Sequence, residues 1–116
     1  MRVAIIGSRG FKDYTTVIKA MKEFENIHGV VESVVSGGAK GADALAERYA
    51  KDNRLPITVY PAEWERYGKK AGYIRNKLIV NDCDFVVAFW DGESTGTKSS
   101  LDYARETGKP VMVINF

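Results

Sequence analysis

The sequence has few of the residues that support a disulfide-bonded or metal-binding protein. Its 116 residues include one cysteine, Cys83, so no intramolecular disulfide can form. Cys83 precedes an apolar run, which favours a small core residue over a reactive thiol. The single histidine, His28, stands before Gly29 at the end of an expected helix, where a surface or C-cap residue is the simpler interpretation. We therefore predict no metal site.

Long hydrophobic runs and a strong charge of one sign are also absent. The first apolar run, residues 3–6, is too short for a signal peptide or a membrane span, so we expect a cytoplasmic protein with no membrane partner. The 17 basic and 15 acidic residues leave a net charge of +2, which by itself is no argument for nucleic acid. The length predicts a single domain over residues 1–116 with a core of its own.

Short apolar runs alternate with helical patterns along the chain. Strands are expected at 3–6, within 30–35, and at 56–61, 85–89 and 111–114; helices at 13–28, 42–53, 70–82 and 97–107; and an irregular stretch at 62–68. This alternation predicts an α/β fold, a Rossmann-like three-layer αβα sandwich with a mainly parallel five-stranded sheet. The order 3-2-1-4-5 places the third strand, which has proline at both ends, at an edge.

Helical spacing also predicts which side chains face the core. In the first helix the expected core-facing stripe is Val17, Ile18, Met21, Phe24 and Ile27, and Asp13 is expected to cap the helix. In the third helix Ile74 and Leu78 are expected to face inward with Ala71.

Three loops follow strands that end at the same edge of the expected sheet. They are Gly7-Ser8-Arg9, the Gly37–Gly41 turn and Ser94–Thr97, and each precedes a helix. Ligands of such sheets bind at the carboxyl ends of the strands near the switch in strand order. A helix start adds free N–H groups and the positive end of the dipole, and glycines let the backbone approach a ligand. The convergence predicts a phosphate or other anion site.

The residue types suggest separate roles within these loops. Gly96 and Thr97 form a helix start that suits a phosphate, although Thr97 is equally suited to being an N-cap. Arg9 and Lys40 can neutralise an anion, with a simply solvated side chain as the alternative for Lys40. Asp43 can bond amides of its own loop or a ligand hydroxyl.

A second informative stretch runs from Trp64 to Asn76 and interleaves aromatic and basic residues. Trp64 or Trp90 can stack on a base, with packing at the core or rim as the alternative, and Arg75 can contact phosphate or ribose. Gly72 interrupts a helical pattern, which suggests close approach of another element or a ligand. The same basic cluster is the one candidate patch for single-stranded nucleic acid.

Taken together, these motifs resemble the SLOG superfamily, named for the DNA-processing protein Smf/DprA and the cytokinin-activating "lonely guy" enzymes, and within it the small YspA-like group. The resemblance covers about residues 2–115. The matching features are Gly7-Ser8-Arg9 with Phe11 and Asp13, Ser36-Gly37-Gly38-Ala39 with Gly41-Ala42-Asp43, Trp64 with Gly68, Ala71-Gly72, Arg75-Asn76, and Gly92, Ser94 and Gly96-Thr97.

The resemblance implies a Rossmann-like domain that binds nucleotides or nucleotide-derived ligands. In the lonely-guy enzymes a Pro-Gly-Gly-x-Gly-Thr-x-x-Glu motif holds the phosphate and supplies a catalytic glutamate, with help from an arginine that Arg75 matches. Here the glutamate position is Ser100, which cannot replace a carboxylate. Asp91 and Glu93 are the nearby acids that could substitute, with solvated loop residues as the simpler interpretation.

We therefore expect a binding or sensing module for a nucleotide or nucleotide-derived ligand, without a cofactor. A nucleoside 5′-monophosphate N-glycosidase is the first alternative, with Arg75 as its best catalytic candidate, and single-stranded DNA binding is the second. A homo-oligomer is an expectation by analogy. The expected ligand-binding residues are Gly7, Ser8, Arg9, Ser36, Gly37, Gly38, Lys40, Gly41, Asp43, Trp64, Arg75, Asn76, Trp90, Ser94, Gly96 and Thr97.

Overall fold

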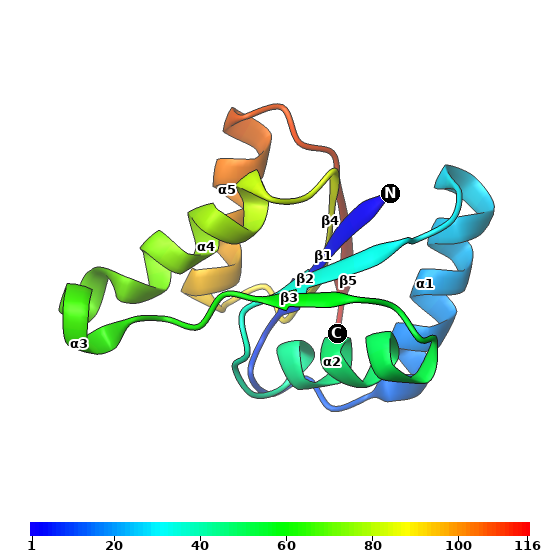
Figure 1. Ribbon diagram of the computed structural model, residues 1–116, viewed down its shortest axis with the longest axis horizontal. Coiled ribbons are helices and arrows are strands. Elements are labelled where there is room, and N and C mark those ends of the chain that lie inside the picture. The colour runs from blue at the N-terminus through cyan, green and yellow to red at the C-terminus, as the bar shows by residue number, and fades with distance from the viewer.

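The computed structural model describes residues 1–116, which form a single sheet with helices on both of its faces (Figure 1). Five strands alternate with helices along the chain. In order, the elements are β1 Arg2–Gly7, α1 Tyr14–His28, β2 Ser33–Ser36, α2 Ala42–Asp52, β3 Ile57–Val59, α3 Trp64–Tyr67, the 3-10 helix η1 Gly68–Lys70, α4 Ala71–Asn81, β4 Phe85–Trp90, α5 Thr95–Glu106 and β5 Val111–Asn115.

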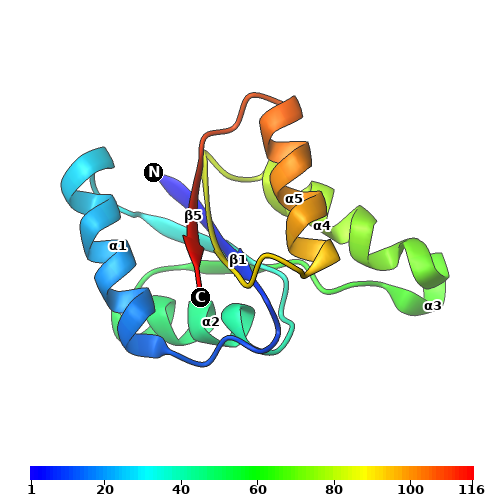
Figure 2. The same ribbon diagram turned by 180° about the vertical axis from the view of Figure 1, so that it is seen from behind.

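The sheet is entirely parallel and has the order β3-β2-β1-β4-β5, which confirms the expected fold. Helices α1 and α2 lie on one face, and α4 and α5 lie on the other (Figures 1 and 2). Side chains of β1 alternate between the two layers: Val3 and Ile5 join the core under α1 and α2, whereas Ala4 and Ile6 join the core under α4 and α5. The strand order reverses between β1 and β4, so the carboxyl ends of these strands form the switch point.

Two of the predicted helix faces are wrong at their margins. In α1 the buried residues are Val17, Ala20, Met21 and Phe24, and Ile18 and Ile27 are exposed because they flank this stripe rather than lie on it. The N-cap prediction is confirmed, because an Asp13 carboxylate oxygen accepts a hydrogen bond from Thr16 N at 3.2 Å.

Helix α4 buries a different face from the one expected. Leu78 is 46% exposed and Ile74 is only half-buried, while Ile79 and Val80 join the core on this face of the sheet. Ala71 is buried as expected, but it belongs to neither core cluster. Helix α3 and the start of α4 project beyond the sheet (Figure 1), and the α4 residues in the core cluster, Ile79 and Val80, come from its last turn. The stretch 62–68, expected to be irregular, contains α3 and begins η1.

Helix α5 begins two residues earlier than expected. Ser94 is its N-cap residue, so Thr97 lies in the first turn and the alternative of Thr97 as N-cap is wrong. Strand β3 is a three-residue edge strand, as the flanking prolines indicated. No helix in the structure is both long and apolar enough to cross a bilayer.

An ion-pair network ties together the amino end of the sheet. Arg2 Nη2 lies 2.6 Å from an Asp82 carboxylate oxygen, and the same guanidinium donates to Ser33 Oγ at 3.2 Å and Thr58 Oγ1 at 2.8 Å. Tyr60 OH donates to the Asp82 carboxylate at 2.8 Å. Residues of β1, β2, β3 and the end of α4 are thereby joined around one arginine.

Candidate functional site

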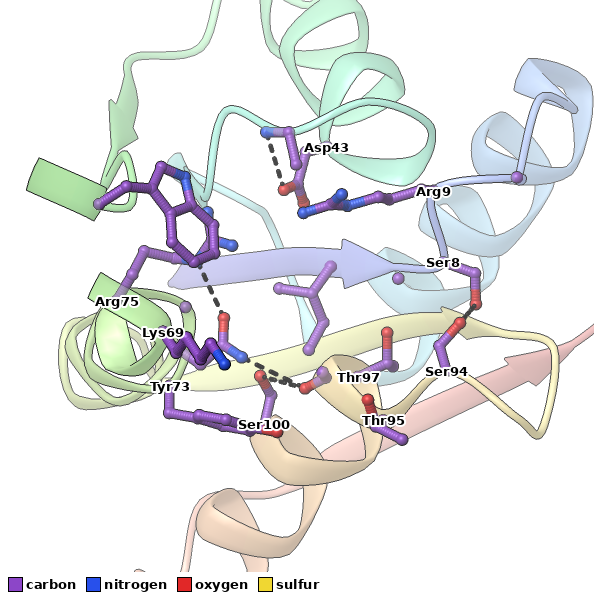
Figure 3. Close-up of a pocket in the computed structure, with 18 residues that line it drawn as sticks. Ser8, Arg9, Asp43, Lys69, Tyr73, Arg75, Ser94, Thr95, Thr97 and Ser100 are labelled. Atoms are coloured by element: carbon purple, nitrogen blue, oxygen red, sulfur yellow. Dashed lines mark hydrogen bonds between the residues drawn. The ribbon is translucent and has the colours of Figure 1, made fainter. Parts of the chain in front are cut away.

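A polar hollow of about 500 Å³ lies at the carboxyl ends of β1 and β4, where the fold places its switch point. Figure 3 shows Asp43 and Arg9 on one side of this hollow and Thr97 and Ser100 on the other. We call it the first hollow; its lining consists of Ile6, Gly7, Ser8, Arg9, Gly10, Ala39, Asp43, Trp64, Lys69, Gly72, Tyr73, Arg75, Asn76, Ser94, Thr95, Gly96, Thr97 and Ser100. Three cationic side chains and a single carboxylate make this lining suitable for an anion.

The buried Ser8 joins the loop after β1 to the loop after β4. Its N–H donates to Phe89 O at 2.9 Å, and its hydroxyl lies 2.8 Å from Ser94 Oγ and accepts from Asp91 N at 3.2 Å. Gly7 is needed beside it, because a Cβ there would lie 2.2 Å from Phe89 O. The loop after β1 and the loop after β4 are therefore held together by hydrogen bonds and form one continuous part of the lining.

The start of α5 supplies unpaired donors to the first hollow. The N–H groups of Thr95, Gly96 and Thr97 donate no hydrogen bond within the chain, and neither does the hydroxyl of Thr97, which is 7% exposed. Ser94 caps the helix without a side-chain hydrogen bond to it. The positive end of this twelve-residue helix therefore has free amides of the kind that an anion accepts.

Arg75 connects three walls of the site. Its Nη1 donates to Gly37 O at 2.8 Å, its Nε donates to Asn76 Oδ1 at 2.9 Å, and Asn76 Nδ2 donates to Gly96 O at 3.3 Å. Burial lowers the pKa of Arg75, which the nearby Asp43 charge opposes, but an arginine stays protonated at any physiological pH. Its Nη2 donates no hydrogen bond within the chain and no carboxylate lies within 4 Å of it, so the guanidinium retains binding capacity.

Asp43, the one carboxylate lining the hollow, is 8% exposed. Burial raises its pKa, while a hydrogen bond from Ala39 N at 3.1 Å and the charge of Arg75 act in the opposite direction. The buried Ser36 hydroxyl adjoins this carboxylate, but its geometry falls short of a hydrogen bond, so its stabilising effect is weak. The interpretation that Asp43 bonds an amide of its own loop is confirmed.

The glycines of the turn after β2 serve packing more than ligand approach. Gly41 has φ +71°, and a Cβ there would lie 2.3 Å from Arg9 O, so the turn is pressed against the loop after β1. A Cβ at Gly37 would lie 2.6 Å from Arg75 Nη1 and 2.9 Å from an Asp43 carboxylate oxygen. Gly37 therefore makes room for Arg75, a role that the sequence did not reveal.

A second hollow of about 360 Å³ adjoins the first. It is lined by Arg9, Gly37, Gly38, Ala39, Lys40, Pro61, Ala62, Trp64 and Arg75. Arg9, Ala39, Trp64 and Arg75 belong to both linings. Most of the turn that was expected to complete one phosphate cradle faces this second hollow instead.

The structure divides the expected site residues into three groups. Gly7, Ser8, Arg9, Asp43, Trp64, Arg75, Asn76, Ser94, Gly96 and Thr97 line the first hollow, and Gly37, Gly38 and Lys40 line only the second. Ser36, Gly41 and Trp90 line neither. Ser36 is fully buried, Gly41 packs on backbone, and Trp90 turns its Nε1 to Ser94 O at 3.1 Å while its ring packs on the core under α4 and α5.

Eight residues of this lining were not among the expected ligand-binding residues: Ile6, Gly10, Ala39, Lys69, Gly72, Tyr73, Thr95 and Ser100. Lys69 and Tyr73 enter the hollow from η1 and α4, and with Gly72 and Asn76 they follow the spacing i, i+3, i+4, i+7 of one helix face. That polar face was the available signal. Trp64 is 53% exposed and covers Gly72, whose added Cβ would meet Trp64 Cη2 at an ordinary 3.5 Å.

The site contains no metal-ligand cluster, and Asp43 is the one carboxylate in its lining. No group of three or more His, Cys, Asp or Glu side chains is arranged to hold a metal ion. The Asp91 carboxylate accepts from Glu93 N at 2.9 Å and Ser94 N at 2.8 Å, and the hydrogen bond from Ser94 N is the main reason that its pKa is lowered. Neither Asp91 nor Glu93 lines the hollow, and Ser100 Oγ donates to Gly96 O at 3.2 Å.

The chain is similar to one protein family, one phage protein and one solved structure. A profile of the "YspA, cpYpsA-related SLOG family" matches residues 1–67. The Gene 61 protein of Mycobacterium phage D29 is 41% identical over 123 aligned residues, which include 99% of this chain and 95% of that protein. A structure of DNA processing protein A from Helicobacter pylori, whose subject is its single-stranded DNA binding mode, aligns with a TM-score of 0.66 and 25% identity.

The alignment with DNA processing protein A covers 97% of this chain but 64% of that one, so the chain spans less than two thirds of that protein. The family profile includes the loops after β1 and β2 and the stretch up to Trp64, which contribute eight of the 18 residues that line the first hollow and eight of the nine that line the second. With the fold, the loops and the profile in agreement, the chain belongs to the YspA, cpYpsA-related SLOG family.

Proposed function

We propose that this protein binds a nucleotide or a nucleotide-derived ligand in the first hollow, with a phosphate on the start of α5. The observation that carries the proposal is the set of unpaired N–H groups at Thr95, Gly96 and Thr97, which face a hollow with three cations. A phosphate placed there would accept these donors together with the Thr97 hydroxyl, and Arg75 would stand behind it.

The remaining lining suits the other parts of a nucleotide. Asp43 and Asn76 line the hollow, and their carboxylate and amide groups are of the kind that bonds ribose hydroxyls. Trp64 and Tyr73, both about half exposed, offer aromatic faces for a base. Trp90, whose ring packs on the core, is not part of this proposal.

The direct test is a binding titration of adenosine and guanosine 5′-monophosphates with the purified protein and with Thr97→Val. The valine keeps the shape of threonine and removes one hydrogen bond, so affinity should fall about fivefold, which corresponds to about 1 kcal/mol. Thr107→Val, at the exposed far end of α5, is the matched control and should bind as wild type. Equal affinities of wild type and Thr97→Val would contradict the placement of the phosphate at the start of α5.

Binding without hydrolysis is the better-supported form of this proposal. An N-glycosidase needs a carboxylate beside the anomeric carbon, whereas Ser100 occupies the expected position and Asp91 is engaged by its own loop. Asp43, the one carboxylate in the lining, accepts a hydrogen bond from Ala39 N of its own loop. Incubation with nucleoside 5′-monophosphates should release no free base. Base release by wild type, lost in Arg75→Ala, would support the enzyme alternative.

Single-stranded DNA binding is a second candidate because of one structural likeness and one surface. The chain shares its fold with a protein whose single-stranded DNA binding has been described, and the basic residues Arg66, Lys69 and Lys70 lie next to Trp64 on the projecting α3–η1 segment. If this candidate is correct, oligonucleotide affinity should fall steeply with salt. Replacement of the three basic residues by glutamine should then abolish oligonucleotide binding, whereas mononucleotide affinity should fall only by the share due to Lys69.

A further inference from the structure

The two hollows are neighbours that share four lining residues. Arg9, Ala39, Trp64 and Arg75 line both, so the boundary between the hollow at the start of α5 and the hollow at the turn after β2 consists of these side chains. The first hollow, at about 500 Å³, is by itself within the range of small-molecule sites. A mononucleotide held on α5 would therefore leave the second hollow free.

The second hollow is built for an anion of its own. Arg9, Lys40 and Arg75 line it, no carboxylate does, and neither Arg9 nor Lys40 forms an ion pair within the chain. The N–H groups of Gly38 and Lys40 donate no hydrogen bond in the structure. Cations without partners beside free amides are what a phosphate requires.

The residues at the boundary can serve both compartments at once. Arg75 uses Nε and Nη1 internally, and its Nη2 is unpaired. Trp64 is 53% exposed and lines both hollows, so a base on either side can reach its ring. A ligand that crosses this boundary would contact the free donor and the aromatic face together.

We infer that the ligand is a dinucleotide-type molecule: two nucleotide units with a phosphate beyond the one on α5. In this arrangement the first phosphate lies on the start of α5, and the further phosphate is bound by Lys40, Arg9 and the amides of the turn after β2. The inference rests on the proposed function and adds the ligand class. The shared chemistry is the second phosphate, supplied by a 3′–5′ phosphodiester or by a pyrophosphate between the units.

The experiment compares three ligands: adenosine 5′-monophosphate, the linear 5′-phosphorylated diadenylate pApA, and diadenosine pyrophosphate. Each is titrated calorimetrically into wild type, Lys40→Gln and Lys69→Gln. Wild type should bind at least one dinucleotide about tenfold more tightly than the monophosphate, the gain expected from one charge-assisted contact. The dinucleotide that shows the gain identifies the linkage.

The two lysine variants form a matched pair, since both side chains are exposed but Lys40 lines only the second hollow and Lys69 only the first. Lys40→Gln should remove most of the tenfold advantage and leave monophosphate affinity unchanged. Lys69→Gln should weaken all bound ligands by a common factor. Unchanged thermal midpoints show that both variants are folded.

The outcomes separate the two proposals. Equal affinity for all three ligands, or a Lys40→Gln variant that retains the dinucleotide advantage, overturns the inference and leaves mononucleotide binding in place. Loss of monophosphate affinity in Lys40→Gln also overturns the inference, because the phosphate of the mononucleotide would then itself be bound by Lys40. Failure of all three ligands to bind wild type overturns the proposed function as well.

Discussion

Each end of the parallel sheet carries an arginine beside a buried or half-buried aspartate, and the two pairs are built differently. At the amino end, Arg2 and Asp82 are about one third exposed, and the guanidinium bonds the Asp82 carboxylate, the Asp82 carbonyl and two side-chain hydroxyls. At the carboxyl end, Arg75 and Asp43 form no ion pair within 4 Å. Asp43 accepts from Ala39 N, and Arg75 donates to Gly37 O and Asn76 Oδ1.

The contrast separates charge used for folding from charge left for a ligand. All three guanidinium nitrogens of Arg2 have partners inside the chain, so little capacity remains there for a ligand. Near Arg75, by contrast, Arg9, Lys40 and Lys69 have no acidic partner, and the first turn of α5 keeps free amides. A folded chain tolerates such unpaired groups where water or a ligand satisfies them.

The pKa values of the two aspartates differ in a way that follows the same contrast. The hydrogen bond from Arg2 lowers the pKa of Asp82, so this carboxylate stabilises the fold when ionised. Burial raises the pKa of Asp43, so its ionised form is held at a cost in folding free energy. Groups kept in an unfavourable charge state gather at functional sites, which agrees with the place of Asp43 in the first hollow.

The largest expected effect comes from breaking the amino-end pair. Arg2→Met retains much of the apolar stem and removes every guanidinium hydrogen bond, so the free energy of unfolding should fall by about 3 kcal/mol. Urea denaturation measures this change. Nucleotide affinity of the remaining folded protein should equal that of wild type, because Arg2 lies at the amino ends of the strands and both hollows lie at the carboxyl ends.

Arg105→Met is the control for Arg2→Met. Arg105 is exposed in the last turn of α5 and forms no ion pair, so its loss should change the free energy of unfolding by less than about 0.5 kcal/mol. If Arg2→Met were no less stable than Arg105→Met, the amino-end network would have no structural role, and the contrast between the two ends would fail.

These predictions rest on a network that the sequence did not reveal. Arg2 and Asp82 are 80 positions apart, and neither belongs to a motif; only the completed sheet brings them together. The strands, by contrast, were predictable because runs such as Phe85–Trp90 are apolar throughout, as a strand covered on both faces must be. Local pattern thus determined the elements, and tertiary geometry determined the pairing of charges.

The same limit explains which of the expected site residues the fold brings together. Ser8, Arg75 and Thr97 were predictable because loops after neighbouring parallel strands meet at one edge. The division of the glycine-rich turn was not, because it depends on Gly41 packing against Arg9 O and on Gly37 admitting Arg75. Leu78 and Trp90 were misplaced since helical spacing does not reveal that α4 overhangs the sheet, nor that the Trp90 ring packs on the core.

At the carboxyl end, Arg75→Ala should reverse the pattern of Arg2→Met. We expect nucleotide affinity to fall about thirtyfold, or about 2 kcal/mol, because a charge-assisted phosphate contact is lost. The unfolding free energy should change little, since removal of a partly desolvated charge offsets the lost bond to Gly37 O. Calorimetric titration and urea denaturation of the same samples measure both quantities.

Arg75→Lys sharpens this result. Lysine keeps the charge but not the planar fork that reaches Gly37, Asn76 and a ligand together, so its affinity should lie between those of Arg75→Ala and wild type. Wild-type affinity in Arg75→Ala would show that the carboxyl-end arginine is as structural as Arg2.

A smaller effect is expected from Gly37→Ala, which leaves every charge in place. The new Cβ would meet Arg75 Nη1 at 2.6 Å, and the flexible guanidinium can yield more easily than backbone. Nucleotide affinity should fall about fivefold, or about 1 kcal/mol, through the displaced arginine. Gly10→Ala is the control, because its Cβ meets nothing within 4 Å and Gly10 also lines the first hollow. Equal affinities of the two variants would mean that the position of Arg75 is unimportant.

The smallest expected effect is that of the two aspartates on how the unfolding free energy varies with pH. The two residues should act in opposite directions. Because the folded pKa of Asp82 is lowered, its stabilising contribution is complete above about pH 4 and is lost as the pH falls through the folded pKa. Because the folded pKa of Asp43 is raised, the folded state holds that proton more tightly, and stability falls as the pH rises from about 4 through the folded pKa.

Asp82→Asn should therefore be less stable than wild type at pH 7, and Asp43→Asn should be more stable. The side-chain amide introduced by Asp43→Asn retains an oxygen for Ala39 N–H and places a donor beside the unpaired Ser36 hydroxyl, so the change removes charge without removing the loop contact. Urea denaturation from about pH 3 to 7 should show the Asp43→Asn difference closing as pH falls toward about 4, and the Asp82→Asn difference closing only below it. An Asp43→Asn protein less stable than wild type at pH 7 would mean that attraction to Arg75 outweighs burial, and that both ends of the sheet use their aspartate for folding.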